Sequence, residues 1–349
     1  MKKLTIKGQS KDSILLIGEH LKNADRYISG DRTVVITDTN VRSHFHKDFP
    51  AGEIISIGPG EVIKNLDTVK TLYGKLVELS ADRSTFVIGI GGGVVCDICG
   101  FVASTYMRGM RFAYIPTTLL AQVDASVGGK TGVNLGGYKN LVGVFNQPEF
   151  VLCDFGLLKT LPVAEMRSGF AEIVKHAVIA DEQLFDFLEQ NFNEAIELDP
   201  AVIEKLVYES LVIKSTIVNA DEREKGKRRK LNFGHTFGHA IEKATGVNHG
   251  EAVSAGMVMA SALSVEKGFL KETEHHRLKT LLEKIGLPTR LRVNMESVLD
   301  ALGKDKKREG EAIHFVLLNA IGKAMIVEMF LNEIKESIQR GLLTAISEK

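Results

Sequence analysis

Short hydrophobic runs in the first part of the chain alternate with longer segments of helical periodicity. Runs rich in β-branched and other apolar residues predict strands at 4–7, 33–38, 53–57, 85–90, 111–116 and 150–153. Between two of them, hydrophobic residues from 61 to 79 recur at helical spacing. Apolar strands separated by helices are typical of a mostly parallel sheet covered on both faces. We therefore predict an α/β domain over residues 1–157.

The pattern changes after Leu157, where helical periodicity becomes dominant. Helices are predicted at 170–179, 182–191, 201–222, 229–245, 251–267, 271–285 and 332–346. Two strand-like runs, 313–318 and 323–327, interrupt this series. The second domain, residues 158–349, is therefore predicted to be mainly α-helical. We expect it to carry the metal and the substrate.

A run of glycines, 91–93, follows the predicted strand at 85–90 and opens a helix. Glycines in this position let the backbone approach a pyrophosphate, which the helix N-terminus attracts. The usual dinucleotide fingerprint is incomplete, because Val94 stands where its third glycine belongs. A plain tight turn therefore remains an alternative to phosphate binding.

Polar residues at other strand ends favour a dinucleotide. Asp38 ends the strand at 33–38, and Thr117 and Thr118 follow the strand at 111–116. Ligands of open α/β sheets bind at the carboxyl ends of the strands. Asp38 would bind ribose hydroxyls and repel a 2′-phosphate, so we predict NAD rather than NADP.

Three histidines form the most informative chemical pattern in the chain. His235 and His239 are four residues apart, so on a helix they share one face, and His249 follows in a second segment. Imidazoles in this arrangement can build an open metal site, for which Glu172 in the helical segment 169–176 can supply a carboxylate. Spacing alone leaves open whether His239 is a ligand, or whether these are structural histidines.

The charge balance directs attention to local clusters of bases. The chain has 44 Lys and Arg residues and 44 Asp and Glu residues, so no net field favours nucleic acid or a membrane surface. Basic residues nevertheless occur in glycine-rich loops or beside the presumed metal ligands: Arg108, Lys130, Lys139, Lys175, Lys214 and Arg228. This placement indicates an anionic substrate with phosphate, carboxylate or both. The glycine-rich segment 124–132 lacks the first glycine of a Walker A loop.

The cysteines and the hydrophobic runs bear on the compartment in which the protein works. Three cysteines make a poor disulfide framework, and Cys96 and Cys99 are predicted to be buried small residues rather than a redox pair. No apolar run is long enough to span a bilayer, and no signal peptide opens the chain. We predict a cytoplasmic protein in a reducing environment.

Several motifs together carry a family resemblance. They occur in order between about Asp38 and Lys323, at 91–97, 116–124, 128–132, 139–143, 171–175, 231–240 and 249–251. In sequence and spacing this set resembles 3-dehydroquinate synthase. The resemblance implies the second step of the shikimate pathway, which leads to chorismate and the aromatic amino acids. The substrate would be 3-deoxy-D-arabino-heptulosonate 7-phosphate, the products 3-dehydroquinate and phosphate, and the cofactors NAD and a divalent metal, usually zinc, with cobalt as an alternative.

The resemblance also implies residue roles. The metal ligands would be Glu172, His235 and His249, with His239 as a catalytic group beside the metal. The NAD contacts would be Asp38, Glu61, Lys64, Gly92, Gly93, Asp97, Thr117, Thr118 and Lys139. The substrate contacts would be Asp124, Lys130, Asn140, Lys175, Lys214, Arg228, Asn232 and Lys323. Arg108 would reach the phosphate from a neighbouring subunit, which implies a homodimer.

Two enzyme classes remain as alternatives. Another sugar-phosphate cyclase, such as 2-deoxy-scyllo-inosose synthase or 2-epi-5-epi-valiolone synthase, would share the metal and NAD motifs but differ in substrate. A metal-dependent polyol dehydrogenase would share the fold and consume NAD. Glu172 and the lysine-containing segment 128–131 favour the synthase over the dehydrogenase. The resemblance leaves open whether the substrate phosphate or a side chain is the base in the elimination.

Overall fold

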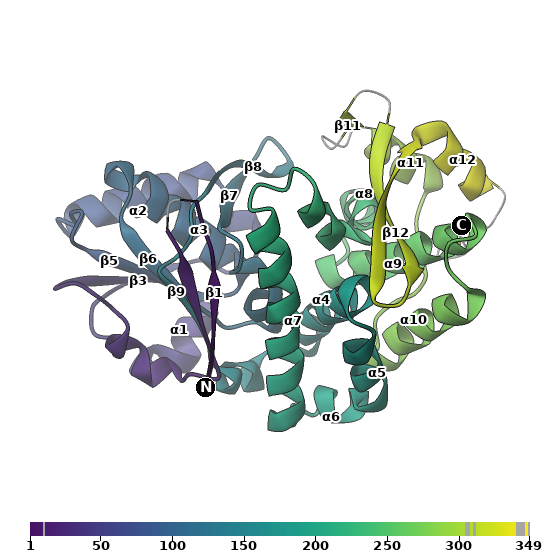
Figure 1. Cartoon of the computed structure of the whole chain (residues 1–349). Coiled ribbons are helices and arrows are strands. Elements are labelled where there is room, and N and C mark those ends of the chain that lie inside the picture. Colours follow the sequence, from purple (N-terminus) through teal and green to yellow (C-terminus); the bar gives the residue numbers. More distant parts are fainter. Residues whose placement is uncertain (10, 304–307, 310–311, 340–345, 348–349) are drawn as a thin grey trace. The chain divides into compact units, whose positions relative to one another are not determined.

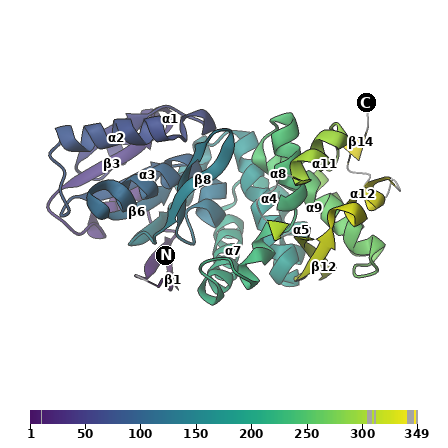
Figure 2. The same ribbon diagram turned by 90° about the horizontal axis from the view of Figure 1, so that it is seen from above.

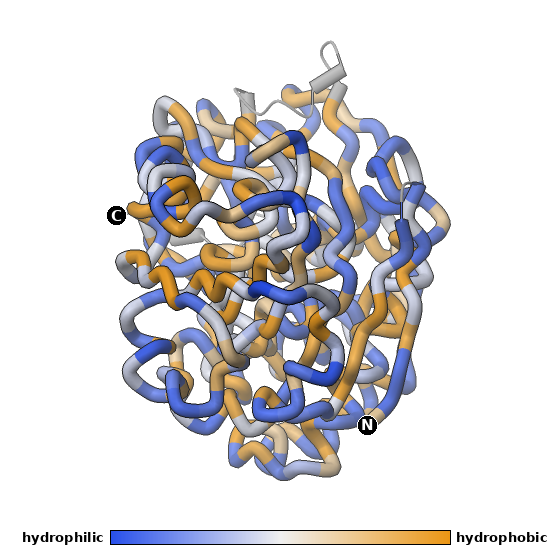
Figure 3. Tube along the Cα trace, turned by 90° about the vertical axis from the view of Figure 1, so that its left-hand side faces the viewer, coloured by the Kyte–Doolittle hydropathy of each residue, from blue (hydrophilic) through white to orange (hydrophobic). Residues whose placement is uncertain are grey.

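The computed structural model describes residues 1–9, 11–303, 308–309, 312–339 and 346–347 (Figure 1). Their contacts group into two compact units, 1–162 with 214–223, and 163–213 with 224–349. Hydrophobic and hydrophilic stretches alternate along the whole trace (Figure 3). Among the described residues, no helix has both the length and the apolar character needed to cross a bilayer. The functional division at residue 157 stays a prediction.

A mostly parallel sheet forms the centre of the first unit, as predicted. Its strands are β1 (Lys2–Ile6), β2 (Ser13–Ile17), β3 (Thr33–Asp38), β4 (Glu53–Ile57), β5 (Phe86–Gly91), β6 (Arg111–Pro116) and β9 (Phe150–Cys153). They lie in the order β1-β2-β9-β6-β5-β3-β4, and each pair is parallel except β1 with β2. The sequence analysis missed β2, because its apolar run is short and follows β1 after only a brief turn.

Alternation along the strands divides this sheet into two buried faces. Ile88 and Ile90 of β5 point into a core that includes Leu21 and Phe150, with Val41 and Phe45 of α1 (Thr39–Phe45) packed against it. On the opposite face, Gly89 leaves space for α3 (Gly93–Thr105), since an added Cβ would lie 2.9 Å from the Cβ of Cys99. The close fit lets α3 pack on the sheet against β5 and β6, and Figure 2 shows α3 beside β6.

Lys130 and Lys139 lie in a β-hairpin, which corrects the prediction of a glycine-rich loop. The hairpin consists of β7 (Lys130–Leu135) and β8 (Tyr138–Phe145). Gly136 and Gly137 connect the strands, with φ angles of 58° and 78°. Two left-handed residues in a two-residue turn match the twist of antiparallel strands, and glycine adopts them without strain. The Gly-Gly pair was the overlooked signal.

The second unit is mainly helical, as predicted. Its helices are α4 (Val163–Ala180), α5 (Glu182–Gln190), α6 (Phe192–Ile196), α8 (His235–Thr245), α9 (His249–Glu266), α10 (Glu272–Ile285), α11 (Met295–Gly303) and α12 (Leu331–Gln339). The long helix α7 (Pro200–Ala220) contributes to both units. A hairpin of β12 (Ala312–Ala320) and β13 (Lys323–Phe330) packs on α4 and α9. The described part also contains the short strands β10 (Leu291–Arg292) and β11 (Arg308–Glu309).

Several predicted helices have different limits in the structure; α4, for example, begins at Val163 rather than at 170. The helix predicted from 61 to 79 is a 3-10 turn (Glu61–Ile63) followed by α2 (Leu66–Glu78), because Asn65 caps α2. The helix predicted over 229–245 is broken at Gly234, whose φ of +76° separates a 3-10 helix (Lys227–Asn232) from α8. The last predicted helix is described as α12 up to Gln339; residues 340–345 lie outside the described part, and β14 (Ile346–Ser347) pairs with β10.

Glycines let α8 and α9 approach closely in the second unit. A Cβ added to Gly256 of α9 would lie 2.1 Å from the carbonyl oxygen of Gly234 and 2.8 Å from the amide nitrogen of Gly238. Both obstacles are backbone atoms of the segment that opens α8, so they cannot rotate away. The contact therefore sets the separation of the helices that start at His235 and His249.

We predict that Gly256→Ala lowers the free energy of unfolding by about 1–3 kcal/mol, because the added methyl group must displace a backbone. Gly74→Ala is the matched control, since Gly74 is an exposed residue of α2 and nothing lies within 4 Å of an added Cβ there. The control should raise stability by about 0.5–1 kcal/mol through helix propensity. Urea unfolding of both variants measures the difference, and equal effects would contradict the proposed packing.

Candidate metal and nucleotide sites

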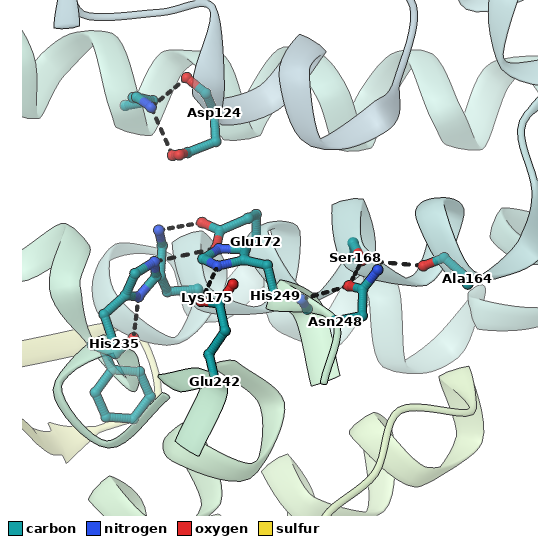
Figure 4. A network of polar contacts seen from close by, with 12 residues as sticks. Asp124, Ala164, Ser168, Glu172, Lys175, His235, Glu242, Asn248 and His249 are labelled. Atoms are coloured by element: carbon teal, nitrogen blue, oxygen red, sulfur yellow. Dashed lines mark hydrogen bonds and ion pairs between the residues drawn. The ribbon is translucent and has the colours of Figure 1, made fainter. Parts of the chain in front are cut away.

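Three side chains that are distant in the sequence converge in the second unit (Figure 4). Glu172 projects from the middle of α4, while His235 and His249 are the first residues of α8 and α9. The Nε2 atoms of both histidines lie 3.5 Å from Glu172 Oε1. One ligand atom from each of the three residues lies within 4.8 Å of the others.

The second nitrogen of each imidazole faces an acceptor. His235 Nδ1 lies 3.2 Å from the carbonyl oxygen of Phe233, and His249 Nδ1 lies 3.6 Å from Glu242 Oε2. An N–H at Nδ1 leaves Nε2, on the side of Glu172, as the nitrogen that can bind a metal. Acceptors behind histidine ligands fix the tautomer in this way at many metal centres.

The donor set fits a divalent transition metal. Bonds of 2.0–2.1 Å at tetrahedral angles place two ligand atoms about 3.3 Å apart, close to the observed 3.5 Å. Two imidazoles and one carboxylate suit zinc or cobalt. Three protein ligands leave a fourth position open, which is the arrangement of catalytic rather than structural zinc.

Burial strengthens the electrostatic interactions within this cluster and shifts the pKa values of its histidines. Glu172 has no exposed surface, and its Oε2 forms an ion pair with the buried Lys175 ammonium one turn further along α4. Burial, together with the nearby Lys175 charge, holds the pKa of His235 well below its ordinary value. Burial also acts to lower the pKa of His249, but the Glu172 and Glu242 carboxylates outweigh it and raise that pKa to about 9.

His239 lies beside this cluster without belonging to the three-residue set. Its ring centroid is 5.3 Å from that of His235 and 6.3 Å from that of His249. The i, i+4 spacing on α8 produces this proximity, as the sequence indicated. The imidazole of His239 therefore lies beside the rings of two of the three residues.

In the first unit, residues from neighbouring strands meet at one edge of the sheet. Asp38 ends β3, Gly92 follows β5, and Thr117 follows β6. The chain leaves β3 towards β4 but leaves β5 towards β6, so the strand order reverses between β3 and β5. Such a reversal opens a crevice in which nucleotides bind.

The details of this edge also suit a dinucleotide. Gly92 caps α3, and an added Cβ there would lie 3.1 Å from the methyl group of Thr118. Gly93 is equally confined, at 3.0 Å from the Cβ of Ala125. Oδ1 of Asp38 accepts the amides of Asn40 and Val41, while Oδ2 can accept from a ligand hydroxyl.

A polar network joins further predicted residues in the first unit. Lys64 Nζ donates to Asp97 Oδ2 and, over 2.6 Å, to Asn140 Oδ1. Asn134 accepts from the Asn140 amide at 2.9 Å and donates to Glu61 Oε1 at 2.8 Å. Asn134 thus links four residues of the predicted set. The sequence analysis missed it, and also Glu242, although Glu242 lies two helical turns after His235 on the same face.

The remaining predicted residues differ in exposure. Lys214 Nζ pairs with Asp124 Oδ1 at 2.6 Å in the first unit. Arg228 is buried, and Asn232 Nδ2 donates to Glu224 Oε1 in the second. Exposed members are Arg108, Lys130, Lys139 and Lys323. Arg108 has a left-handed φ of 67°, directly after Met107 at 48°. Cys96 and Cys99 are buried, as predicted, and Cys153 is buried as well.

Comparison with protein families and characterised proteins gives consistent matches. A family model described as 3-dehydroquinate synthase N-terminal matches residues 54–168, and one described as 3-dehydroquinate synthase C-terminal matches residues 169–308. A protein of Sulfurovum sp. (strain NBC37-1) named 3-dehydroquinate synthase is 44% identical over 91% of each chain. A protein of the same name from Nitrosomonas europaea is 43% identical over 85% of this chain and 84% of its own.

Solved structures of related enzymes share the fold. The 2-epi-5-epi-valiolone synthase of Streptomyces hygroscopicus, with NAD+ and Zn2+ bound, has a TM-score of 0.88 at 29% identity over 99% of each chain. A 2-deoxy-scyllo-inosose synthase complexed with carbaglucose-6-phosphate, NAD+ and Co2+ has a TM-score of 0.86 at 29% identity, over 97% of this chain and 100% of its own. A probable glycerol dehydrogenase from Sinorhizobium meliloti shows the fold alone, with a TM-score of 0.67 at 16% identity over 95% and 96% of the chains.

We predict that Lys64→Met lowers the free energy of unfolding by about 3 kcal/mol, because it leaves the Asp97 carboxylate largely buried without its counter-ion. Burial already raises the pKa of Asp97, against the pull of Lys64. Adding Asp97→Asn should recover much of the loss. Lys75→Met on α2 is the control, since its partner Glu78 is exposed and the pair contributes little. Urea unfolding distinguishes the variants; similar losses for both lysines would refute the prediction.

Proposed function

The chain belongs to the 3-dehydroquinate synthase family, and from this membership we propose how its residues carry out the reaction. The enzyme is a carbon–oxygen lyase that converts 3-deoxy-D-arabino-heptulosonate 7-phosphate to 3-dehydroquinate and phosphate in the shikimate pathway. The observation that carries the residue assignment is the convergence of Glu172, His235 and His249 from three helices.

We propose these three residues as the metal ligands, with zinc as the resident ion and cobalt as a substitute. The donor chemistry and the separations of the ligand atoms support this assignment. The related cyclases with Zn2+ or Co2+ support a divalent metal.

NAD is assigned to the first unit. The contacts we propose are Asp38, Glu61, Lys64, Gly92, Gly93, Asp97, Thr117, Thr118 and Lys139. Their support is the strand reversal between β3 and β5, the confined glycines at the start of α3 and the network around Asn134. NAD+ in the related cyclase structures supports the same cofactor. The first unit then serves as the nucleotide-binding domain and the second as the metal-binding domain.

An anionic substrate accounts for the remaining polar residues. The proposed contacts are Asp124, Lys130, Asn140, Lys175, Lys214, Arg228, Asn232 and Lys323, with Arg108 supplied by a second copy of the chain. The bases among them suit the carboxylate and the phosphate of the substrate. We further propose a homodimer in the cytoplasm.

The protein residues position the substrate and manage its protons. Bound NAD would accept and return a hydride, while the bound metal would polarise the substrate hydroxyls. Lys175 and Arg228 hold anionic groups, so that binding energy orients the reacting carbons. His239 lies next to the ligand set and takes a hydroxyl proton through its imidazole. The buried surroundings of Lys175 strengthen its attraction for an anion.

Other activities of the superfamily fit less well. The 2-deoxy-scyllo-inosose and 2-epi-5-epi-valiolone synthases are 29% identical to this chain, whereas proteins named 3-dehydroquinate synthase reach 43–44%. The polyol dehydrogenase alternative retains support only at the level of the fold.

The reaction can be tested with 3-deoxy-D-arabino-heptulosonate 7-phosphate, zinc and trace NAD. We expect phosphate release to exceed the supplied NAD many times, without net growth of NADH absorbance, because the cofactor is regenerated. If enzyme shown to hold metal and NAD released no phosphate, this substrate assignment would be wrong. NADH that accumulates with an added polyol would instead support a dehydrogenase.

His235→Ala and His239→Ala should separate metal binding from proton transfer. His235→Ala removes a proposed ligand, so bound zinc and activity should be lost together. His239→Ala should retain stoichiometric zinc but lose turnover. Zinc content by elemental analysis and phosphate release are measured on the same preparations. Full activity with bound zinc in His235→Ala, or loss of zinc in His239→Ala, would contradict these roles.

A further inference from the structure

His249 is the least buried of the three proposed ligands, and two separate contacts restrain it. Its imidazole side chain is 30% exposed, compared with 10% for His235 and none for Glu172. Its position at the first residue of α9 gives it no preceding helical turn for support. The direction of its Nε2 atom must therefore be set by neighbouring groups.

Glu242 contacts the far side of this imidazole. Its Oε2 lies 3.6 Å from His249 Nδ1, while His249 Nε2 lies 3.5 Å from Glu172. The ring is thus held between two carboxylates on opposite nitrogens, as Figure 4 shows. Glu242 comes from α8, and its side chain is only 12% exposed, so its carboxylate is confined. An anionic acceptor behind a histidine makes the facing nitrogen a better donor to a metal.

Asn248 and Ser168 fix the backbone from which His249 projects. Asn248 caps α9: its Oδ1 accepts from the Gly250 amide at 3.0 Å, and in a capping box its own amide donates to Glu251 Oε2 at 3.3 Å. The same oxygen accepts from the Ser168 hydroxyl on α4 (Figure 4). A Cβ added to Gly250 would lie 2.4 Å from Ser168 Cα, so the two helices touch at this point.

The hydrogen bond between Ser168 and Asn248, called the tether below, joins the same two helices that carry Glu172 and His249. Ser168 lies one helical turn before Glu172 on α4, and Asn248 directly precedes His249. The hydrogen bond between Ser168 and Asn248 therefore sets the separation between the ligand on α4 and the ligand on α9. Its partners are held in place, because Ser168 is buried and also contacts the Ala164 carbonyl oxygen at 3.1 Å.

We propose that Glu242, Asn248 and Ser168 are positioning residues that hold His249 in the orientation a divalent metal requires. Glu242 sets the rotation of the imidazole, and the Ser168–Asn248 bond sets its distance from Glu172. The inference rests on the proposed ligand set and adds the residues that determine its affinity. None of the three residues needs to touch the metal or the substrate.

Co2+ binding to the metal-stripped full chain, followed by its visible absorption and by chelator competition, tests the role of Glu242. Loss of an outer carboxylate from a histidine ligand weakens metal affinity about 10–100-fold, so Glu242→Ala should weaken Co2+ binding to that extent. Glu242→Gln should recover part of the loss, because its amide oxygen still accepts from Nδ1. Glu194→Gln, an exposed carboxylate of α6 in the same unit, should leave affinity unchanged. Affinity in Glu242→Ala equal to that of the unaltered chain overturns the proposal for this residue.

Ser168→Ala tests the tether against a matched serine. Ser254→Ala removes an equally buried hydroxyl on α9, one that donates to the Pro288 carbonyl oxygen at 2.9 Å and not to Asn248. Both variants should lower the thermal midpoint of the metal-free chain, but only Ser168→Ala should weaken Co2+ affinity, several-fold. Equal affinities in the two variants overturn the tether, even if Glu242→Ala fails to fold.

His249→Ala distinguishes this inference from the ligand assignment beneath it. If His249→Ala binds Co2+ as tightly as the unaltered chain, the ligand set itself is wrong. If His249→Ala loses Co2+ while Glu242→Ala and Ser168→Ala keep full affinity, the ligand set stands and only the positioning inference fails. Loss of affinity in all three, with the serine and glutamate controls unaffected, supports both.

Discussion

A carboxylate with no exposed surface is the constraint on which the second unit depends. Glu172 lies in the middle of a helix whose other neighbours are largely apolar, and an isolated buried charge costs several kcal/mol or more. Lys175 from the same helix and two histidines from other helices surround it. The ion pair with Lys175 compensates much of this charge before any metal is considered. The arrangement that relieves the charge also supplies the three donors that a catalytic divalent metal uses.

Close backbone packing makes this convergence possible. Glycines at 234, 238 and 256 bring α8 against α9, and Gly250 brings the start of α9 against α4. Side chains at these positions would separate the helices and move His235 and His249 away from Glu172. The glycines near the histidines thus act on the site through helix separation. They do so without supplying a donor atom themselves.

In the first unit, the edge of a parallel sheet brings the predicted residues together. Its parallel strands end together, and the reversal of strand order between β3 and β5 provides an edge where glycines and a carboxylate meet. Asn134, on the β7–β8 hairpin, then connects Glu61 with Asn140 and, through it, with Lys64 and Asp97.

The sequence by itself determined the parallel sheet, most of the helices, the glycine turn after β5 and the family, because hydrophobic periodicity and ordered motifs are local properties. It did not determine the break at Gly234 or the β7–β8 hairpin. A left-handed glycine inside a helical pattern, and glycines flanked by alternating residues, are each compatible with more than one conformation until their neighbours are known. Spacing also allowed His239 to be a ligand as readily as His249.

Only the tertiary structure decided which side chains meet. Glu242 and His249 are seven residues apart but on different helices, and Ser168 lies eighty residues before Asn248. Asn134 belongs to no recognisable motif, and only its position on β7 brings it into contact with Glu61 and Asn140. Contacts of this kind arise from helix packing and strand register, which bring distant residues together for reasons that no local pattern records.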